Sequence, residues 1–243
     1  GGVQEDGTLT ASGQVVANDI DHDTLSYSVD KTEGSYGKLS LDSATGEWVY
    51  TLDNAKAQGL AEQQKVTETF TVTVTDNHTD GTVTQQVVVT VTGQNDAPTI
   101  TTQTVATGGV QEDGTLTASG QVVADDLDSD TLSYSVDKTA GSYGSLSLDS
   151  SSGKWVYTLD NGKAQGLAAQ QSVTESFTVT VTDNHTGGTV TQQVVVTVTG
   201  QNDAPTITTE TVASGDVQED GTLTARGQVV AGDTDSDTLS YSV

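Results

Sequence analysis

Short runs of alternating apolar and polar residues dominate the chain. They occur at residues 25–29, 39–41, 48–52, 70–74 and 83–92, and clusters of Gly, Asp and Asn separate them. A period of two is typical of β-strands that bury one face. About seven such runs, with turn signals roughly every 8–12 residues, predict an all-β sandwich. Only the stretch 54–64 is rich in helix-forming residues, and we expect one or two helical turns there.

The chain repeats itself. The sequence GGVQEDGTLTASGQVVA begins at Gly1 and again at Gly108, and QNDAPTITT begins at Gln94 and again at Gln201, so the period is 107 residues. A third, partial copy ends at Val243. A period of this length is that of a domain rather than of a solenoid unit. The sequence therefore predicts tandem β-sandwich domains.

Proline suggests where the domains meet. Pro98 and Pro205 each stand in NDAP, after the strand-like VVVTVTG. Proline ends a strand and stiffens the entry to the next domain. We expect sandwiches at 1–98 and 99–205 and a partial third repeat at 206–243, whose apolar side chains and strand edges would be exposed. A second phasing, with domains at 30–136 and 137–243, stays open. Since the first residue is Gly, we expect a piece of a larger protein.

Composition alone is ambiguous about folding. With 33% hydrophobic residues and a net charge of −26, the chain has features of disordered proteins, but the strand pattern outweighs them. Aromatic residues are few and fall at apolar positions of the predicted strands. Large aromatic side chains dominate the energetics of a core. We therefore predict these as core anchors: Trp48, Tyr50, Phe70, Trp155, Tyr157 and Phe177.

The charge balance excludes some classes of binding partner. The chain contains eight Lys and Arg residues and 34 Asp and Glu residues. Such an acidic surface repels phosphate backbones and anionic lipids. We therefore expect neither nucleic acid nor a membrane surface as partner. The apolar run Val87–Val89 is far short of the roughly 20 residues that span a bilayer, so no membrane insertion is expected. The absence of cysteine excludes disulfides and thiolate metal sites.

An acidic DxDxD motif occurs in every copy. Calcium takes six to eight oxygen ligands, largely carboxylates and carbonyls. If the segment is extended, alternate carboxylates point to one side. It is not an EF-hand loop, since Thr24 and Asp30 stand where Gly and Glu are needed. Taken alone, a solvated turn is an equally good interpretation. The motif residues are Asp19, Asp21, Asp23, Asp126, Asp128, Asp130, Asp233, Asp235 and Asp237.

The setting of the motif favours a metal site. VTVTGQNDAP at Val89, VQEDGT at Val110, VVADDLDSDTLSYSV at Val122 and VTVTDN at Val179 follow an order that resembles the calcium-binding motifs of cadherin-type domains. The resemblance implies Ca²⁺ at the joint between neighbouring repeats. Beside DxDxD, it assigns ligands at Glu5, Asp53, Asp76, Asn95, Asp96, Glu112, Asp160, Asp183, Asn202 and Asp203.

The motifs depart from the cadherin pattern in two places. Asn54 and Ala55 follow Asp53 where a further acidic residue is usual, and Ala97 replaces an Asn in the linker. We therefore expect each joint to hold fewer ions than a cadherin joint.

A second resemblance covers the whole chain. EDGTLTASG, DxDxDTLSYSV, GxWVYTLDN, VTVTDN and TGQNDAP, in this order, resemble the VCBS repeats of very large bacterial surface proteins, including RTX adhesins. The resemblance implies a tandem cadherin-like β-sandwich that is extracellular, exported by type I secretion and involved in cell adhesion and biofilms. It would act as a spacer that calcium stiffens and that projects a distal binding domain.

Other functions remain as alternatives. A repeat that binds a glycan or a protein ligand would need an exposed aromatic platform, and Tyr36 and Tyr143 in GSYG are the candidates. The three histidines share no metal-ligand spacing and are predicted to be exposed turn residues: His22, His78 and His185. No nucleophile elbow, phosphate loop or HExxH occurs, so we do not expect an enzyme.

Overall fold

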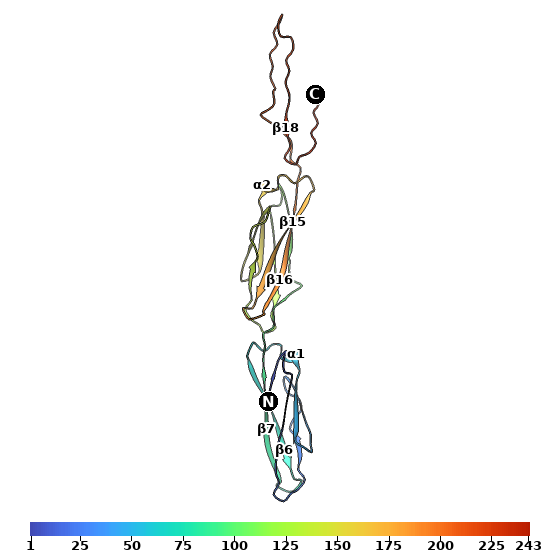
Figure 1. The fold of residues 1–243 in the computed structure, drawn as a ribbon, viewed down its shortest axis with the longest axis vertical. Helices are drawn as coiled ribbons and strands as arrows, with labels where there is room; N and C mark the ends of the chain where they lie inside the picture. Colours follow the sequence, from blue (N-terminus) through green and yellow to red (C-terminus); the bar gives the residue numbers. More distant parts are fainter. The chain divides into compact units, whose positions relative to one another are not determined.

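Two β-sandwiches and a C-terminal segment make up the chain (Figure 1). The structure is a computed structural model and describes residues 1–243. The chain divides into two compact units. Unit 1 contains Gly1–Thr99 with the loops Asp125–Leu132 and Thr182–Thr189, and unit 2 contains the remainder. No helix has the length and apolar character needed to cross a membrane.

The first sandwich packs a four-stranded sheet, in the order β1-β7-β6-β3, against a three-stranded sheet, β2-β5-β4. The strand pairings of this sandwich are antiparallel except that of β1 with β7, which is parallel with Gly2 opposite Thr90. One short helix follows β5, as the sequence predicts. The elements are β1 (Gly2–Gln4), β2 (Thr10–Gln14), β3 (Ser26–Val29), β4 (Gly37–Leu41), β5 (Glu47–Leu52), α1 (Asn54–Ala57), β6 (Lys65–Thr75) and β7 (Thr82–Thr92).

The second sandwich has the same topology, with sheets β12-β15-β16-β9 and β10-β14-β13. Short strands β8 (Thr99–Ile100) and β11 (Ala124–Asp125) form a separate two-stranded sheet. The remaining elements are β9 (Thr107–Gln111), β10 (Thr117–Gln121), β12 (Ser133–Val136), β13 (Gly144–Leu148), β14 (Lys154–Leu159), α2 (Asn161–Ala164), β15 (Ser172–Thr182) and β16 (Thr189–Thr199).

Alternating side chains build each core. In β5, Trp48, Tyr50 and Leu52 are buried while the residues between them are exposed, and β6 alternates in the same way. The rings of Tyr50 and Phe70 pack with their centroids 5.9 Å apart. The predicted aromatic anchors of both copies are buried, so the prediction of the core is confirmed.

A buried carboxylate fixes the GSYG loop. Glu68 accepts hydrogen bonds from the Tyr50 hydroxyl and, at 2.9 Å, from the backbone N–H of Tyr36. Burial and the Glu68 carboxylate raise the pKa of the Tyr50 hydroxyl far above its usual value. Tyr36 is half-buried and packs against the core, so it does not form the exposed aromatic platform that a glycan-binding repeat would need. Tyr143 is half-buried at the same place in the second sandwich.

The C-terminal segment, residues 206–243, contains only β17 (Thr206–Ile207) paired with β18 (Ala231–Gly232) and a bridge between Val212 and Gln228. Leu223, Val229 and Tyr241 are exposed there, as expected of a partial copy, whereas Val230 and Leu239 are half-buried.

Candidate metal centre

The DxDxD loop gathers its carboxylates by turning. Ser129 has φ +63°, and the Asp130 N–H donates to Asp126 Oδ1 at 3.2 Å. Oxygen atoms of Asp126, Asp128 and Asp130 lie within 4.8 Å of one another. The expected clustering is present, but the premise of an extended segment is wrong, because a side chain–backbone turn draws the carboxylates together.

Polar groups of the linker reach this loop. The backbone N–H of Asp96 donates to Asp128 Oδ2 at 2.7 Å. Asn95 Nδ2 donates to Asp183 Oδ2 at 3.0 Å, and Asp183 lies directly after β15. All of these residues belong to unit 1. The structure therefore brings together the linker, the DxD and the later Asp that the cadherin resemblance singled out.

Glu5 is fully buried next to this group. It follows β1, its Oε1 accepts from Gln58 Nε2 at 2.8 Å, and its Oε2 accepts from the Gln94 N–H at 3.1 Å. Burial raises the pKa of Glu5, and the charges of Asp96 and Asp128 raise it further. We call the following set the first acidic cluster: Glu5, Asn95, Asp96, Asp126, Asp128, Asp130 and Asp183.

The first acidic cluster has more oxygen atoms than donors. Asn95 Oδ1, Asp96 Oδ2, Asp126 Oδ2 and Asp128 Oδ1 are buried without a hydrogen-bond partner. Burial first, then mutual repulsion, raises the pKa of Asp96 and of Asp128. Buried polar atoms in native proteins are normally paired, so this group needs an explanation. Its donor set, carboxylate and amide oxygens, is the one that calcium prefers.

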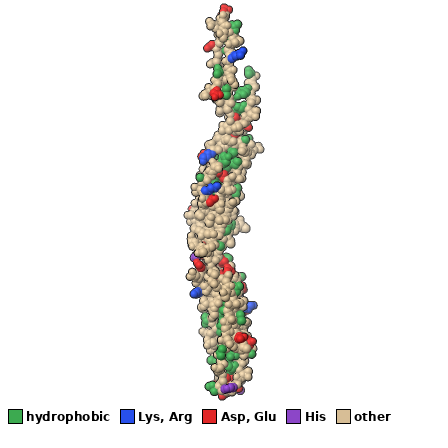
Figure 2. Space-filling model, viewed as in Figure 1, with side chains coloured by type: hydrophobic (Ala, Val, Ile, Leu, Met, Phe, Trp, Pro, Cys, Tyr) green, Lys and Arg blue, Asp and Glu red, His purple; other side chains and the backbone are tan.

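Few cations balance the cluster. His185 lies beside it, with Nδ1 2.8 Å from Glu62 Oε2 and Nε2 3.4 Å from Asp130 Oδ2. The hydrogen bond to Glu62 raises the pKa of His185. His185 is half-buried and paired with Glu62 and Asp130, which corrects the prediction that it is an exposed turn residue. On the face shown in Figure 2, Lys and Arg side chains are scattered among many acidic ones.

A glycine makes room for Asp183. A Cβ built at Gly188 would lie 1.8 Å from Asp183 Oδ1, so any side chain there would displace the carboxylate. The Asp183 Oδ1 atom also accepts from the His185 N–H at 2.7 Å. The turn after β15 thus fixes the orientation of Asp183, which is almost fully buried.

A second acidic cluster repeats this geometry within unit 2. The Asp203 N–H donates to Asp235 Oδ2 at 2.7 Å, and buried Glu112 accepts from Gln165 and from the Gln201 N–H. Asp203 Oδ2 and Asp235 Oδ1 are buried without partners, and burial raises the pKa of Asp203. We define the cluster as Glu112, Asn202, Asp203, Asp233, Asp235 and Asp237, in which Asn202 Nδ2 contacts the Asp203 carbonyl at 2.9 Å.

Comparison with known families agrees with the fold. The sequence model of the bacterial cadherin-like domain matches residues 1–93 and 95–200. The chain belongs to this family. Domains of this kind serve as extracellular adhesion or spacer modules and not as enzymes. Among curated proteins, none matches the chain.

Solved cadherin structures share the fold. Mouse cadherin-23 EC22–24 is 19% identical, with a TM-score of 0.55, over 96% of this chain and 74% of that one. Protocadherin gamma B2 domains 1–5 are 17% identical, with a TM-score of 0.53, over 97% of this chain and 45% of that one. This chain thus spans less than half of the protocadherin, and at such identities the likeness establishes the fold alone.

The DxDxD motif of the first cadherin-like domain makes the same turn, with His22 at φ +67° and the Asp23 N–H donating to Asp19 Oδ1 at 3.2 Å, but its middle aspartate is not buried. Asp21 is exposed, and the only contact of Asp23 with a basic side chain is 3.4 Å to His78. Asp76 Oδ1 accepts from the His78 N–H. No backbone N–H donates to Asp21 as the Asp96 N–H does to Asp128. His22 and His78 are exposed, as predicted.

The LD motif aspartates each pair with a lysine of the short helix that follows. Asp53 precedes α1 and pairs with Lys56 at 3.7 Å, and Asp160 pairs with Lys163 in the same way. The next residue, Asn54, instead bonds Asp6 Oδ1 at 2.6 Å.

Sequence reasoning missed Asp6 and its counterpart Asp113. The charge of Asp6 raises the pKa of both Glu5 and Asp96, and the charge of Asp113 does the same for Glu112. The acidic pair in QEDG was the available signal.

Proposed function

We propose that these cadherin-like domains are spacer repeats of a bacterial cell-surface adhesin of the VCBS or RTX type, and that Ca²⁺ rigidifies the segments that link them. The observation that supports this most strongly is the set of buried, unpartnered carboxylate oxygens in each acidic cluster. Repelling carboxylates become favourable ligands when a divalent cation lies among them.

The ligand assignment follows from the contacts. In the first acidic cluster, Asp126, Asp128 and Asp96 offer oxygens that have no other partner, and Asn95 Oδ1 is a fourth. Glu5 and Asp183 would complete the shell, with Asp130 at its edge. The second acidic cluster would use its own six members. Asp19, Asp21, Asp23, Asp76, Asp53 and Asp160 remain predicted ligands.

We also propose domain boundaries near Pro98 and Pro205. The paired strands of the first sandwich all fall within residues 2–92, and those of the second within 107–199. The alternative phasing, 30–136 and 137–243, would divide the pairing of β3 with β6. On the proposed phasing, each acidic cluster spans a linker.

Calcium suits this role because of where it is abundant. Extracellular modules bind calcium at about 10⁻⁴–10⁻³ M, so the sites would fill outside the cell. Binding that favours the folded state contributes RT ln(1 + [L]/Kd), about 0.4–1.4 kcal/mol per site at 1 mM calcium. Once the linker and the DxDxD loop share an ion, the linker loses freedom to bend. Export by type I secretion and a role in biofilms remain parts of the proposal.

Thermal melts and hydrodynamics test the proposal. The whole chain is measured in calcium, in EGTA and in magnesium, by differential scanning fluorimetry and by small-angle X-ray scattering. We expect calcium alone to raise the melting temperature and to narrow the distribution of molecular lengths. An unchanged melting temperature and an unchanged length distribution would overturn the clamp. The glycan-binding alternative has no support from Tyr36 or Tyr143, because both are half-buried.

A further inference from the structure

His185 lies between two carboxylates at the edge of the first acidic cluster. Its Nδ1 is 2.8 Å from Glu62 Oε2, and its Nε2 is 3.4 Å from Asp130 Oδ2. The three side chains come from separate loops: Glu62 precedes β6, Asp130 lies between β11 and β12, and His185 lies between β15 and β16. All three belong to unit 1. The fold therefore brings an imidazole ring to a group of acidic side chains.

The two ring nitrogens of His185 have different roles. An ionised carboxylate can only accept hydrogen bonds, so Nδ1 carries a proton and donates it to Glu62. Nε2 makes no hydrogen bond to Asp130, whose Oδ2 is buried without a hydrogen-bond partner. A histidine that binds a metal ion through one nitrogen usually donates the other N–H to a carboxylate or a carbonyl, which fixes the orientation of the ring. Glu62 therefore orients His185 as the ligand of a metal ion at Nε2 would be oriented.

Oxygen ligands stand next to Nε2. Oxygen atoms of Asp126, Asp128 and Asp130 lie within 4.8 Å of one another. Asp128 is only 8% exposed, and its Oδ1 has no hydrogen-bond partner. Zinc bonds to nitrogen and oxygen are about 2.0–2.2 Å long, and two ligands of a tetrahedral zinc ion are then separated by about the distance between His185 Nε2 and Asp130 Oδ2. One ion can therefore bind both atoms.

The ligand chemistry favours a transition metal over calcium at this edge. Calcium takes oxygen ligands, so the imidazole has no part in the proposed calcium site. Imidazole and carboxylate together suit Zn²⁺ and related dications. The pairing also recurs in the first copy, where His78 Nε2 lies 3.4 Å from Asp23 Oδ2. A histidine facing the last aspartate of DxDxD is therefore a property of the repeat and not of one loop.

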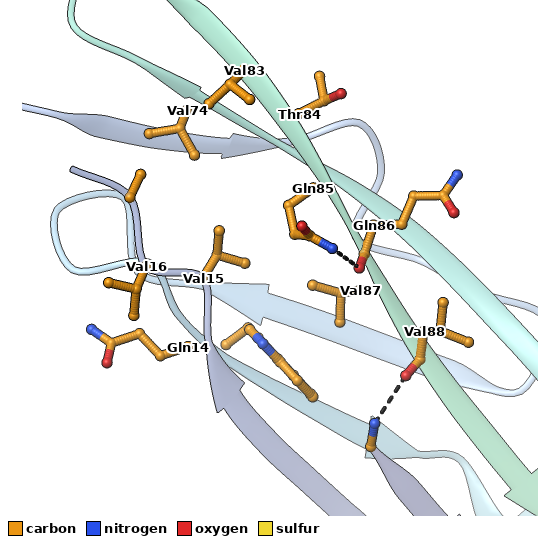
Figure 3. Close-up of a pocket in the computed structure, with 13 residues that line it drawn as sticks. Gln14, Val15, Val16, Val74, Val83, Thr84, Gln85, Gln86, Val87 and Val88 are labelled. Carbon is orange, nitrogen blue, oxygen red and sulfur yellow. Dashed lines mark hydrogen bonds between the residues drawn. The ribbon is translucent and has the colours of Figure 1, made fainter. Parts of the chain in front are cut away.

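The open groove of the first sandwich offers no such ligands. It has a volume of about 450 Å³ and lies between residues 14–17 and strand β7. Figure 3 shows valine, glutamine and threonine side chains around it, and none of its lining residues is a histidine, an aspartate or a glutamate. A transition-metal ion therefore has a better site beside His185 than in this groove.

We propose that His185 Nε2 and Asp130 Oδ2 bind a transition-metal dication such as Zn²⁺ and that Glu62 is the positioning residue that holds the imidazole. An oxygen of Asp126 or Asp128 and a water molecule would complete a four-coordinate shell. The bound ion would hold together the two loops that carry Asp130 and His185. This site does not rest on calcium binding, because its defining ligand is a nitrogen atom.

Nuclear magnetic resonance of the imidazole nitrogens tests the site. The full chain has three histidines, so labelling histidine with ¹⁵N gives a small set of ring signals to follow during a titration with zinc chloride. We expect His185 Nε2 to shift at the lowest zinc concentrations while Nδ1 keeps its proton. His22 is the internal control, since its Nδ1 contacts the Ile20 carbonyl and no carboxylate. No shift of His185 Nε2 up to high micromolar zinc would overturn the site, and an equal shift of His22 would show an adventitious ion only.

Calorimetric zinc titration of variants tests the roles of the two carboxylates. Asp130→Asn removes a charged ligand and Glu62→Ala removes the partner of Nδ1, and each should weaken zinc binding about tenfold or more. Glu62→Gln keeps an oxygen acceptor and should recover part of the loss. Glu33→Ala is the matched control, because Glu33 and Glu62 are both replaced by alanine in the second copy, and it should leave the zinc affinity unchanged.

The outcomes separate this site from the calcium proposal. Full zinc affinity in Asp130→Asn would overturn the ligand assignment, and full affinity in Glu62→Ala, or no recovery in Glu62→Gln, would overturn the positioning role. A calcium-dependent melting temperature without any zinc response would overturn this site and leave the calcium proposal standing. Zinc binding without a calcium effect on melting would support this site alone.

Discussion

Replacing Asp128 by Asn should change stability in opposite directions with and without calcium. Asp128 is buried in the first acidic cluster, with Oδ1 unpartnered, and its pKa is raised by burial and then by the charges of Asp126, Asp130 and Asp183. Without calcium, asparagine removes a buried charge that the neighbours repel. With calcium, it removes a ligand charge. The variant should therefore be more stable than the parent in EGTA and gain less from calcium.

The geometry gives the size of both effects. Two carboxylate oxygens that lie within 4.8 Å of each other repel by at least about 3.5 kcal/mol at an effective dielectric constant of about 20. Because Asp126 and Asp130 are partly exposed, screening reduces the relief to about 1–2 kcal/mol. Calcium at 1 mM contributes about 0.4–1.4 kcal/mol per site. For a domain of this size, 1 kcal/mol shifts the melting temperature by about 4–8 °C.

Differential scanning calorimetry in EGTA and in millimolar calcium measures the stability without calcium and the gain in melting temperature that calcium gives. The parent should gain about 2–11 °C from calcium at each site, and the variant less than half of that at the first acidic cluster. Asp216→Asn is the control, since Asp216 is an exposed aspartate outside the predicted ligand set, and it should leave the calcium gain nearly unchanged. If Asp128→Asn destabilised the protein in EGTA, or kept the full calcium gain, the electrostatic reasoning would be refuted.

Three further predictions concern pH and the cores. Without calcium, the free energy of unfolding should fall as the pH rises above 3.8, the value for an ordinary aspartate, and through the raised pKa of Asp128 in the folded chain. The reason is that the folded chain binds more protons than the unfolded one in this range. Thermal melts at several pH values should show a steeper fall for the parent than for Asp128→Asn. Glu68→Ala should cost about 2–4 kcal/mol in urea denaturation, since it leaves the Tyr50 hydroxyl unpaired, whereas Glu33→Ala, the residue that the second copy carries at this position, should cost almost nothing. Phe177→Ala should cost about 3–5 kcal/mol and unfold the second sandwich before the first, seen as two transitions; a single shifted transition would contradict independent cores.

The fold was predictable because its pattern is local. Alternation in residues 48–52 and 70–74 placed Trp48, Tyr50 and Phe70 in the core, and strand geometry makes that inference direct. Pairing partners were not predictable. The parallel pairing of β1 with β7 joins residues almost 90 positions apart, and nothing in either segment alone specifies the other.

The acidic clusters were predictable in membership and less so in geometry. The order of motifs identified Glu5, Asp96 and Asp128 as candidate calcium ligands, but only the folded chain places the Asp96 N–H against Asp128. From the sequence alone, all three DxDxD motifs were predicted to supply calcium ligands. The structure separates them, because a middle aspartate is buried only where a linker residue donates to it, as at Asp128 and Asp235 but not at Asp21.

The most direct test of calcium binding is a crystal structure of the chain grown in millimolar calcium, with anomalous scattering used to identify the ion. The account predicts an ion in the first acidic cluster, bound by oxygens of Asp96, Asp126 and Asp128 at about 2.3–2.6 Å, and a second ion at Asp203 and Asp235. A well-ordered structure whose clusters hold only water under these conditions would contradict it.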